Sequence, residues 1–352
     1  MQGSISMKAW WISKRSVSSA LFVFASALAS PAVAQDFYAG KTITLAVGSG
    51  TGGGFDLYAR TVARHIGKHL PGRPNVIVQN MPGAGSMKAA EYIFTHAPKD
   101  GTAIAIVFPG AIVEPLIAGR EKFRFDPPKF DFIGSANSGA RLCITFHSSA
   151  VKTFEDAQRI TATMGGSAAG DSTSDYALLM NALAGTKFKV VLGYKSTSET
   201  LLAVERGEVD GLCGFDASSL QAQRPAWWGT GQINKLVQAS LEPRDDLTKL
   251  GAPSIWKFVS GDNRKAVELV LAQQEFHRPF IAPPGTASAQ LALLRKAFDE
   301  TMTDPDFLAD AAKASLDIAP KSGEVVSRLV QQMYATPPHL VALVTKALRP
   351  AQ

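Results

Sequence analysis

The chain has little of what metal-binding, nucleic-acid-binding or membrane-spanning proteins usually show. Only 2 of its 352 residues are cysteine, and neither has another Cys or a His at metal-ligand spacing, so no zinc site is indicated. No stripe of Lys and Arg with interleaved aromatic residues is present, which argues against nucleic acid as a partner. Beyond the N-terminal segment, no run reaches the roughly 18 uncharged residues that a spanning helix needs.

Catalytic motifs are missing as well. Ser167 follows two glycines but lacks the second glycine of a nucleophile elbow, and the nearest histidine, His147, lies in another segment. His65 and His69 have i, i+4 spacing without the Glu of a zinc protease motif, so we expect them on an exposed helix face. The sequence therefore favours a protein that is not an enzyme and carries no cofactor or metal.

Residues 1–34 have the order of a Sec signal peptide. Three basic residues precede an apolar run at 20–29, and Ala32-Val33-Ala34 supplies the Ala-x-Ala exit. The alternative is a retained single-span anchor. Cleavage after Ala34 would lower the formal charge from +6 to +3 (6 minus 3) and leave 318 residues (352 minus 34). We predict a soluble, monomeric periplasmic chain with two domains.

Cys143 and Cys213 each lie in an apolar run that is typical of a strand. In an oxidising compartment, two such cysteines form either a disulfide or two buried free thiols. The sequence leaves both alternatives open.

Short apolar runs alternate with helical patterns along most of the chain. Strands are predicted at 42–47, 76–78 and 102–108, with helices at 57–70 and 87–97 between them, and a second βα series runs from 141 to 213. This alternation predicts two α/β lobes with parallel sheets. From about residue 280 the pattern becomes helical, and we expect this tail to pack back on the first lobe.

Three loops rich in Gly and Ser join a predicted strand to a helix, at 48–54, 80–86 and 165–170. Ligands of open α/β sheets bind at this edge, where unpaired backbone N–H groups and the helix dipole favour an anion. Three such loops from two lobes could hold carboxylates without a buried arginine. The dinucleotide fingerprint GxGxxG fails in the first loop because position 55 is Phe.

Single residues near these loops have two readings each. Asp56 either accepts a hydrogen bond from a ligand or satisfies the helix N–H groups and dipole. Lys195 is either a carboxylate partner or a solvated loop lysine. Phe108, Tyr194 and Phe215 either form apolar walls of a site or belong to the core. The sequence alone does not choose between these readings.

The residues resemble the substrate-binding proteins of tripartite tricarboxylate transporters, the Bug or TctC family. One mark is the triple glycine followed by Phe55-Asp56-Leu57-Tyr58-Ala59-Arg60, and the others follow in the family's order along nearly the whole chain. The matching segments are 41–47, 52–60, 78–85, 97–102, 193–195, 206–211, 281–286 and 302–307.

The resemblance implies a two-lobed periplasmic-binding-protein fold of type II-like α/β class, with parallel-core sheets and two crossover strands. It implies lobe 1 at 35–136 plus 251–352 and lobe 2 at 137–250. It also implies a small carboxylate ligand, held largely by backbone amides, and membrane transporter subunits as partners. The implied ligand-binding residues are Ser49, Gly50, Thr51, Gly53, Gly54, Phe55, Asp56, Gly83, Ala84, Gly85, Ser86, Phe108, Ser167, Ala168, Asp171, Tyr194, Lys195, Ser196, Phe215 and Asp216.

Several positions depart from the family's usual pattern. Ser49 stands where the family usually has Phe, and Met81 replaces a frequent Arg. Phe55 near the mouth of the site leads to the hypothesis of a bulkier or more apolar acid, such as an aromatic one. Asp171 would disfavour a second carboxylate on the ligand by charge repulsion.

The predicted function is capture of a small organic acid for uptake by a tripartite tricarboxylate-type transporter. Two alternatives belong to other classes. The same fold serves as the ligand-sensing partner of a signalling receptor, and a secreted hydrolase would show itself by turnover of simple esters.

Overall fold

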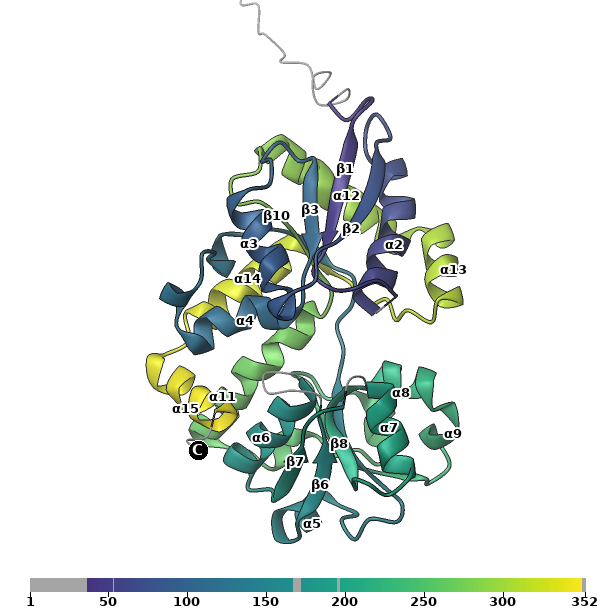
Figure 1. The fold of residues 1–352 in the computed structure, drawn as a ribbon, viewed down its shortest axis with the longest axis vertical. Coiled ribbons are helices and arrows are strands. Elements are labelled where there is room, and N and C mark those ends of the chain that lie inside the picture. The colour runs from purple at the N-terminus through teal and green to yellow at the C-terminus, as the bar shows by residue number, and fades with distance from the viewer. Residues whose placement is uncertain (1–36, 53, 167–171, 195–196, 350–352) are drawn as a thin grey trace, which may run out of the picture.

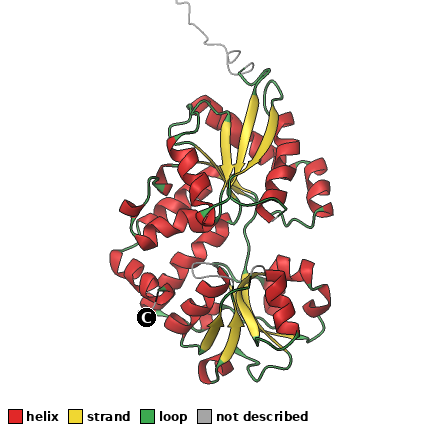
Figure 2. Cartoon of the chain, in the orientation of Figure 1, coloured by secondary structure: helices red, strands yellow, loops and turns green. Residues whose placement is uncertain are grey.

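The computed structural model describes residues 37–349 except Gly53, 167–171 and 195–196. Figure 1 shows two α/β lobes joined by connecting segments, with the sheet of each lobe flanked by helices, as the colouring of Figure 2 makes clear. The predicted two-lobed α/β fold is therefore confirmed. Among the described residues, no helix combines the length and apolar character needed to cross a bilayer.

The sheet of the first lobe has six strands in the order β11-β4-β10-β3-β1-β2. β1, β2 and β3 run parallel, whereas β10 is antiparallel to both β3 and β4. All four residues of β3 are buried, as expected for a central strand that is covered on both faces. The strands are β1 (Thr42–Val47), β2 (Asn75–Asn80), β3 (Ala103–Ile106), β4 (Asp131–Ser135), β10 (Pro279–Ala282) and β11 (Lys321–Ser322).

Helices cover both faces of this first sheet. α2 and α12 pack on one face, with α13 against α2, and α3, α4 and α14 pack on the other. The helices are α2 (Gly54–Ile66), α3 (Met87–Thr95), α4 (Pro109–Ala118), α12 (Ser288–Thr303), α13 (Pro305–Lys313) and α14 (Gly323–Tyr334).

The sheet of the second lobe has five strands in the order β7-β6-β8-β5-β9. β6, β7 and β8 are parallel, and β5 is antiparallel to β8 and β9. α6 covers one face and α7 the other. The elements are β5 (Arg141–Phe146), α5 (Phe154–Arg159), β6 (Ala162–Gly165), α6 (Ser172–Ala184), β7 (Phe188–Val191), α7 (Thr197–Glu205), β8 (Gly211–Asp216), α8 (Ala217–Gln223), α9 (Pro225–Trp228), β9 (Ile233–Ala239) and α10 (Asp245–Lys249).

Two segments carry the chain between the sheets, and we call them together the junction: residues 136–141 and 274–278. They are joined by main-chain hydrogen bonds, from Gly139 N to Gln274 O at 3.2 Å, from His277 N to Asn137 O at 3.0 Å and from Ala136 N to Arg278 O at 3.1 Å. The two crossovers therefore form one paired connection rather than two independent linkers.

The remaining helices α11 (Gly261–Leu271) and α15 (Pro338–Leu348) lie against α6 of the second lobe. α15 also contacts α4 of the first lobe, and the apolar core is continuous across both lobes on this side. On the side of α2 and α7, each lobe has its own core cluster. The division of the chain at residue 250 stays a prediction, because α15 touches both lobes.

Local signals explain several boundaries. α5 begins after Thr153, whose hydroxyl accepts from Asp156 N at 3.1 Å while the Asp156 carboxylate accepts from Thr153 N, a capping box. No helix was predicted at 109–118, because α4 contains Pro115 and its apolar residues show little helical periodicity. Burial among its neighbours, rather than its own pattern, makes this segment helical.

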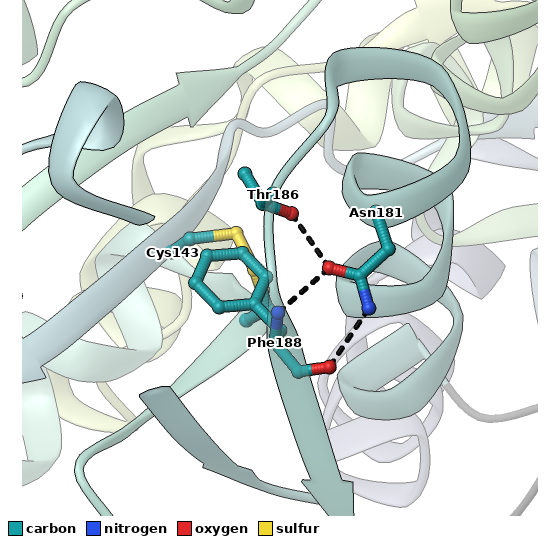
Figure 3. Close-up of a disulfide and its surroundings, with 5 residues drawn as sticks. Cys143, Asn181, Thr186 and Phe188 are labelled. Carbon is teal, nitrogen blue, oxygen red and sulfur yellow. Dashed lines mark hydrogen bonds between the residues drawn. A yellow bond between two sulfur atoms is a disulfide. The ribbon is translucent and has the colours of Figure 1, made fainter. Parts of the chain in front are cut away.

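A disulfide joins Cys143 of β5 to Cys213 of β8 (Figure 3), which settles the alternative that the sequence left open. Both residues are fully buried and lie where the pairing of the two strands shifts register. The bond closes a segment of 70 residues. By the loop-entropy relation, such a bond stabilises the folded lobe by about 4 kcal/mol.

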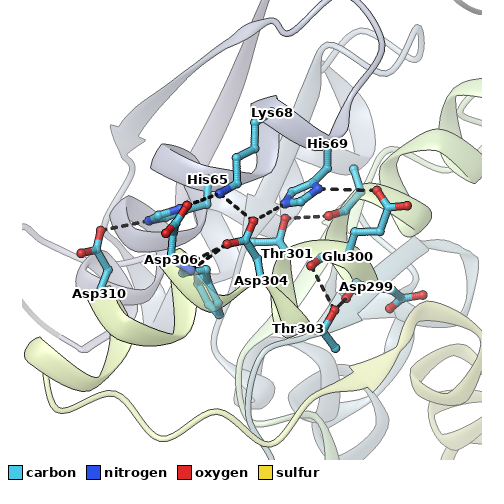
Figure 4. Close-up of polar contacts among 12 residues, drawn as sticks. His65, Lys68, His69, Asp299, Glu300, Thr301, Thr303, Asp304, Asp306 and Asp310 are labelled. Carbon is cyan, nitrogen blue, oxygen red and sulfur yellow. Dashed lines mark hydrogen bonds and ion pairs between the residues drawn. The ribbon is translucent and has the colours of Figure 1, made fainter.

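His65 and His69 were predicted on an exposed face, and this is wrong. His65 Nε2 of α2 lies 2.9 Å from Asp310 Oδ2 of α13, and His69 Nε2, in the turn after α2, lies 2.8 Å from Oδ2 of Asp304, which caps α13 (Figure 4). Lys68 also pairs with Asp304, at 2.6 Å. The charged seam is tertiary, since its acidic partners lie more than 230 residues further along the chain.

Candidate functional site

The first glycine loop leaves β1 and enters α2. Gly52 has φ of +79°, a left-handed conformation that glycine adopts without strain. Gly50, Thr51 and Gly54 are exposed. Because the first N–H groups of a helix have no partner within the helix, this loop presents donors to solvent at the start of α2.

Asp56 holds this loop in place. Its side chain is buried, and its carboxylate accepts from Gly52 N at 2.8 Å, from Arg60 Nε at 3.0 Å and from Asn80 Nδ2 at 2.9 Å. Asn80 Nδ2 also donates to Ser49 O at 3.0 Å. Of the two readings of Asp56, the geometry favours the structural one, because both carboxylate oxygens already have partners within the protein.

The pKa of Asp56 reflects these contacts. Burial raises it, but the hydrogen bonds from Arg60, Gly52 and Asn80 outweigh burial and hold the pKa below its ordinary value. Asp56 is therefore ionised at neutral pH, and its charge is matched by Arg60.

The second glycine loop is fastened to the first through Ser86. Its hydroxyl donates to Gly48 O at 2.8 Å and accepts from Phe108 N at 3.0 Å. Gly48 is required here, since a Cβ at that position would lie 2.3 Å from Ser86 Oγ. The residues before Ser86, namely Gly83, Ala84 and Gly85, are exposed. The structure thus brings the predicted positions of both loops together at the carboxyl ends of β1, β2 and β3.

Phe55 and Phe108 lie side by side at this edge, with ring centroids 4.4 Å apart. Both are partly exposed. The guanidinium of Arg278 stacks on the Phe55 ring, with Cζ 4.2 Å from its centroid, and lies 4.9 Å from that of Tyr58. The loop edge therefore combines aromatic surface with a cation that was not among the residues predicted from the sequence.

The second lobe contributes fewer of the predicted residues. Phe215 packs in the core of that lobe, and Asp216 caps α8 by accepting from Ser219 N at 3.0 Å. Tyr194 is partly exposed. The predicted positions Gly53, Ser167, Ala168, Asp171, Lys195 and Ser196 lie outside the described residues.

Polar and charged side chains gather at the junction. Arg141 Nη2 donates to His277 Nε2 at 2.6 Å, so the ring proton is on Nδ1, which lies 3.8 Å from Asp216 Oδ2. Burial, followed by the charges of Arg278 and Arg141, lowers the pKa of His277 well below its ordinary value. The imidazole is therefore neutral, and two arginines face one carboxylate here.

Several buried atoms at the junction lack a hydrogen-bond partner among the described residues. They are Asn137 Oδ1, Gln274 Oε1, His277 Nδ1 and Arg278 Nε. Buried polar groups in folded proteins are nearly always paired, so such a concentration marks a place that needs an explanation beyond stability. The sequence does carry one sign of this cluster, because His277 and Arg278 stand directly before the fully buried strand β10. Charged side chains are seldom buried without a partner.

A cavity of about 230 Å³ lies between the lobes on the side of α8. It is lined by residues of α8 and its surroundings and by the loop after α13, namely Ala217, Ser218, Gln221, Trp228, Arg244, Ser315, Leu316 and Asp317. None of the predicted ligand-binding residues lines it. Among the described residues, no group of three or more His, Cys, Asp or Glu side chains is placed to hold a metal ion.

The sequence model of one family, the tripartite tricarboxylate transporter family receptor, matches residues 58–343. The chain belongs to this family. Its members are periplasmic solute-binding proteins rather than enzymes. A UPF0065 protein from the 5′ region of gbd in Cupriavidus necator is 28% identical over 300 residues, which cover 82% of this chain and 83% of that one.

Solved structures share the fold at lower identity. A TctC solute-binding protein from Polaromonas is 20% identical, with a TM-score of 0.67 over 88% of this chain and 99% of that one. MatC from Rhodopseudomonas palustris with bound malate is 20% identical, with a TM-score of 0.61 over 86% of this chain and 99% of that one. Another R. palustris protein, with adipate, is also 20% identical, with a TM-score of 0.62 over 86% and 97%.

Proposed function

We propose that this receptor captures a small organic acid between its lobes in the periplasm and delivers it to the membrane subunits of a tripartite tricarboxylate-type transporter. The observation that carries the proposal is the pair of fastened loops at the edge of β1, β2 and β3. They present exposed backbone donors at the start of α2, an arrangement suited to an anion. The malate and adipate bound by proteins of the same fold support a carboxylate.

Lobe closure would let the transporter distinguish the loaded receptor from the empty one. Ligand contacts from both lobes exist only when the lobes meet, so the ligand shifts the population toward the closed state that the transporter recognises. The separate core clusters of α2 and α7 leave that side of the molecule without shared apolar packing. Movement about the junction would open and close this side.

The same proposal covers the processing of the chain, its oligomeric state, the division of the lobes and the ligand contacts. The signal peptide is cut after Ala34, the mature receptor is a monomer, and the lobes divide near residues 136 and 250. The ligand contacts are those predicted from the loops, with the second lobe contributing around Tyr194. The partly exposed rings of Phe55 and Phe108 favour an acid with a flat apolar body, such as an aromatic one.

A thermal-shift screen of residues 35–352 tests the proposal. The panel contains benzoate, succinate and citrate beside amino acids and sugars. A solute that binds only the folded state raises the melting temperature, by an amount that grows with concentration above the Kd. We expect a shift with at least one of the acids and none with the sugars. A shift with amines or sugars alone would refute the capture of organic acids.

A further inference from the structure

Arg278 stands at an unusual place for a cation. It enters β10 from the junction, and its Nη2 lies 3.6 Å from the point where a Cβ on Gly54 would be. Gly54 is the first residue of α2, so the guanidinium lies beside the positive end of a helix dipole. Cations are favoured at the other end of a helix, and this placement costs free energy unless an anion lies nearby.

Within the described chain Arg278 forms no direct ion pair, although the charge of Asp216 acts on it from a longer distance. The guanidinium Nη1 of Arg278 donates to the carbonyl of His277 at 3.0 Å. Its Nε is buried without a partner. Asp216 Oδ1 accepts from Ser218 Oγ at 2.6 Å and from Ser219 N at 3.0 Å, and Arg141 shares the charge of this carboxylate with Arg278. A half-buried cation with free donors is therefore held ready at the loop edge.

The surroundings of Arg278 fix its orientation. Its backbone N–H donates to Ser135 Oγ at 3.1 Å, and its guanidinium is stacked on Phe55 and lies near Tyr58. Burial, the largest cause, lowers its pKa to about 10, which still leaves the side chain charged at neutral pH. A positioned guanidinium binds a carboxylate through two parallel hydrogen bonds.

We propose that Arg278 binds the carboxylate of the transported acid, together with the N–H groups at the start of α2, while Phe55 and Phe108 contact its flat apolar body. The inference rests on the proposed function and adds to it the side chain that selects for charge. It also explains why two arginines share one carboxylate at the junction, since the carboxylate of the ligand would balance the second positive charge.

The experiment measures binding by calorimetry to the mature protein and to the variants R278M and R278K. The probes are benzoate, succinate and citrate, each compared with its neutral amide. We expect the wild type to bind an acid but not its amide. R278M, which keeps the apolar volume, should weaken that binding about 30-fold or more. R278K should weaken it by less, because lysine keeps the positive charge but lacks the two parallel N–H donors of the guanidinium. The control R328M removes an exposed arginine of α14 and should bind as wild type.

The outcomes separate the two proposals. If the wild type binds none of the acids, the proposed function itself fails. If it binds an acid and R278M binds it equally well, Arg278 is not the anchor, although the function stands. If succinate or citrate binds and benzoate does not, the proposed contact of Phe55 and Phe108 with a flat apolar ligand is wrong.

Stability gives an independent readout. The melting temperature of unliganded R278M should equal or exceed that of the wild type, because an unpaired cation has been removed. A clear fall in R278M with unchanged affinity would assign Arg278 to structure. Should R278M not fold, the wild type decides, since equal binding of an acid and its amide overturns the inference.

Discussion

The loop after β1 and the junction lie close together and are built differently. At the loop, Asp56 has three hydrogen-bond partners within the protein, and Ser86 of the second glycine loop donates to Gly48 O and accepts from Phe108 N. At the junction, Asn137, Gln274 and Arg278 each keep a buried atom without a partner among the described residues. The side chains that hold the loops have all found partners within the protein, whereas those at the junction have not.

The difference separates two roles, holding the loops in place and binding the ligand. A polar network whose members are all paired stabilises one loop conformation, and so it positions the backbone donors without using its own side chains for the ligand. At the junction, Arg278 Nε and His277 Nδ1 are unpaired donors whose cost a bound anion can remove, whereas Asn137 Oδ1 and Gln274 Oε1 are acceptors that call for a donor. The ordered loop and the unpaired junction together make a preorganised receptor.

The largest effect is expected from breaking the paired network of the loop at Asp56. Asp56→Ala removes a buried, ionised carboxylate together with its hydrogen bonds from Gly52 N, Arg60 and Asn80, and should lower the free energy of unfolding by about 3 kcal/mol. Urea denaturation at pH 7 measures it. Asp262→Ala on the exposed face of α11 is the control and should change it by no more than about 0.5 kcal/mol.

The same variant carries a pH prediction. Because the folded pKa of Asp56 is lowered, its contribution is complete above the unfolded pKa of about 3.9 and is lost as pH falls through the folded value. The difference between wild type and Asp56→Ala should therefore shrink below about pH 4. A difference that stays constant from pH 7 to pH 3 would show that the carboxylate charge is not what stabilises the loop.

A smaller effect is expected at the link between the two loops. Ser86→Ala leaves Gly48 O and Phe108 N unpaired, and should cost about 2 kcal/mol. Ser315→Ala is the matched control, because Ser315 also has a positive φ but is exposed. Thermal unfolding of both variants checks the prediction, and equal losses would assign the effect to backbone strain.

The smallest effect is expected at the junction. Gln274→Met removes one hydrogen bond to Tyr176 OH but also an unpaired Oε1, so the free energy of unfolding should change by less than about 1 kcal/mol. The same exchange at buried Gln238 breaks bonds from Arg244 N and to Ala252 O, and should cost about 3 kcal/mol. A loss at Gln274 as large as that at Gln238 would contradict the contrast between the regions.

Much of the fold could be predicted from the sequence. The run at 42–47 becomes β1 with the predicted bounds, and the second predicted series begins at 141 with β5, because buried strands have clear local patterns. α4 and β9 were missed, since Pro115 and the mixed composition of 233–239 hide them. Their structure comes from the neighbours that bury them.

The candidate site was predicted less completely. The glycine loops were found because their spacing marks the strand-to-helix turns. Arg278 was missed, because nothing within 20 residues of it shows that it will meet Phe55. The two residues of that contact lie 223 positions apart in the sequence (278 minus 55). That Tyr194 and the loop residues contact the ligand stays a prediction.

The sequence by itself determined the alternation of strands and helices, the glycine loops and the family, since these depend on local pattern and on ordered motifs. Only the tertiary structure decided that Asp56 faces inward to Gly52 and Asn80, that His65 and His69 pair with α13, and that Arg278 lies unpaired beside the start of α2. The physical reason is that burial and charge pairing depend on which distant segments meet, and a local pattern does not encode those meetings.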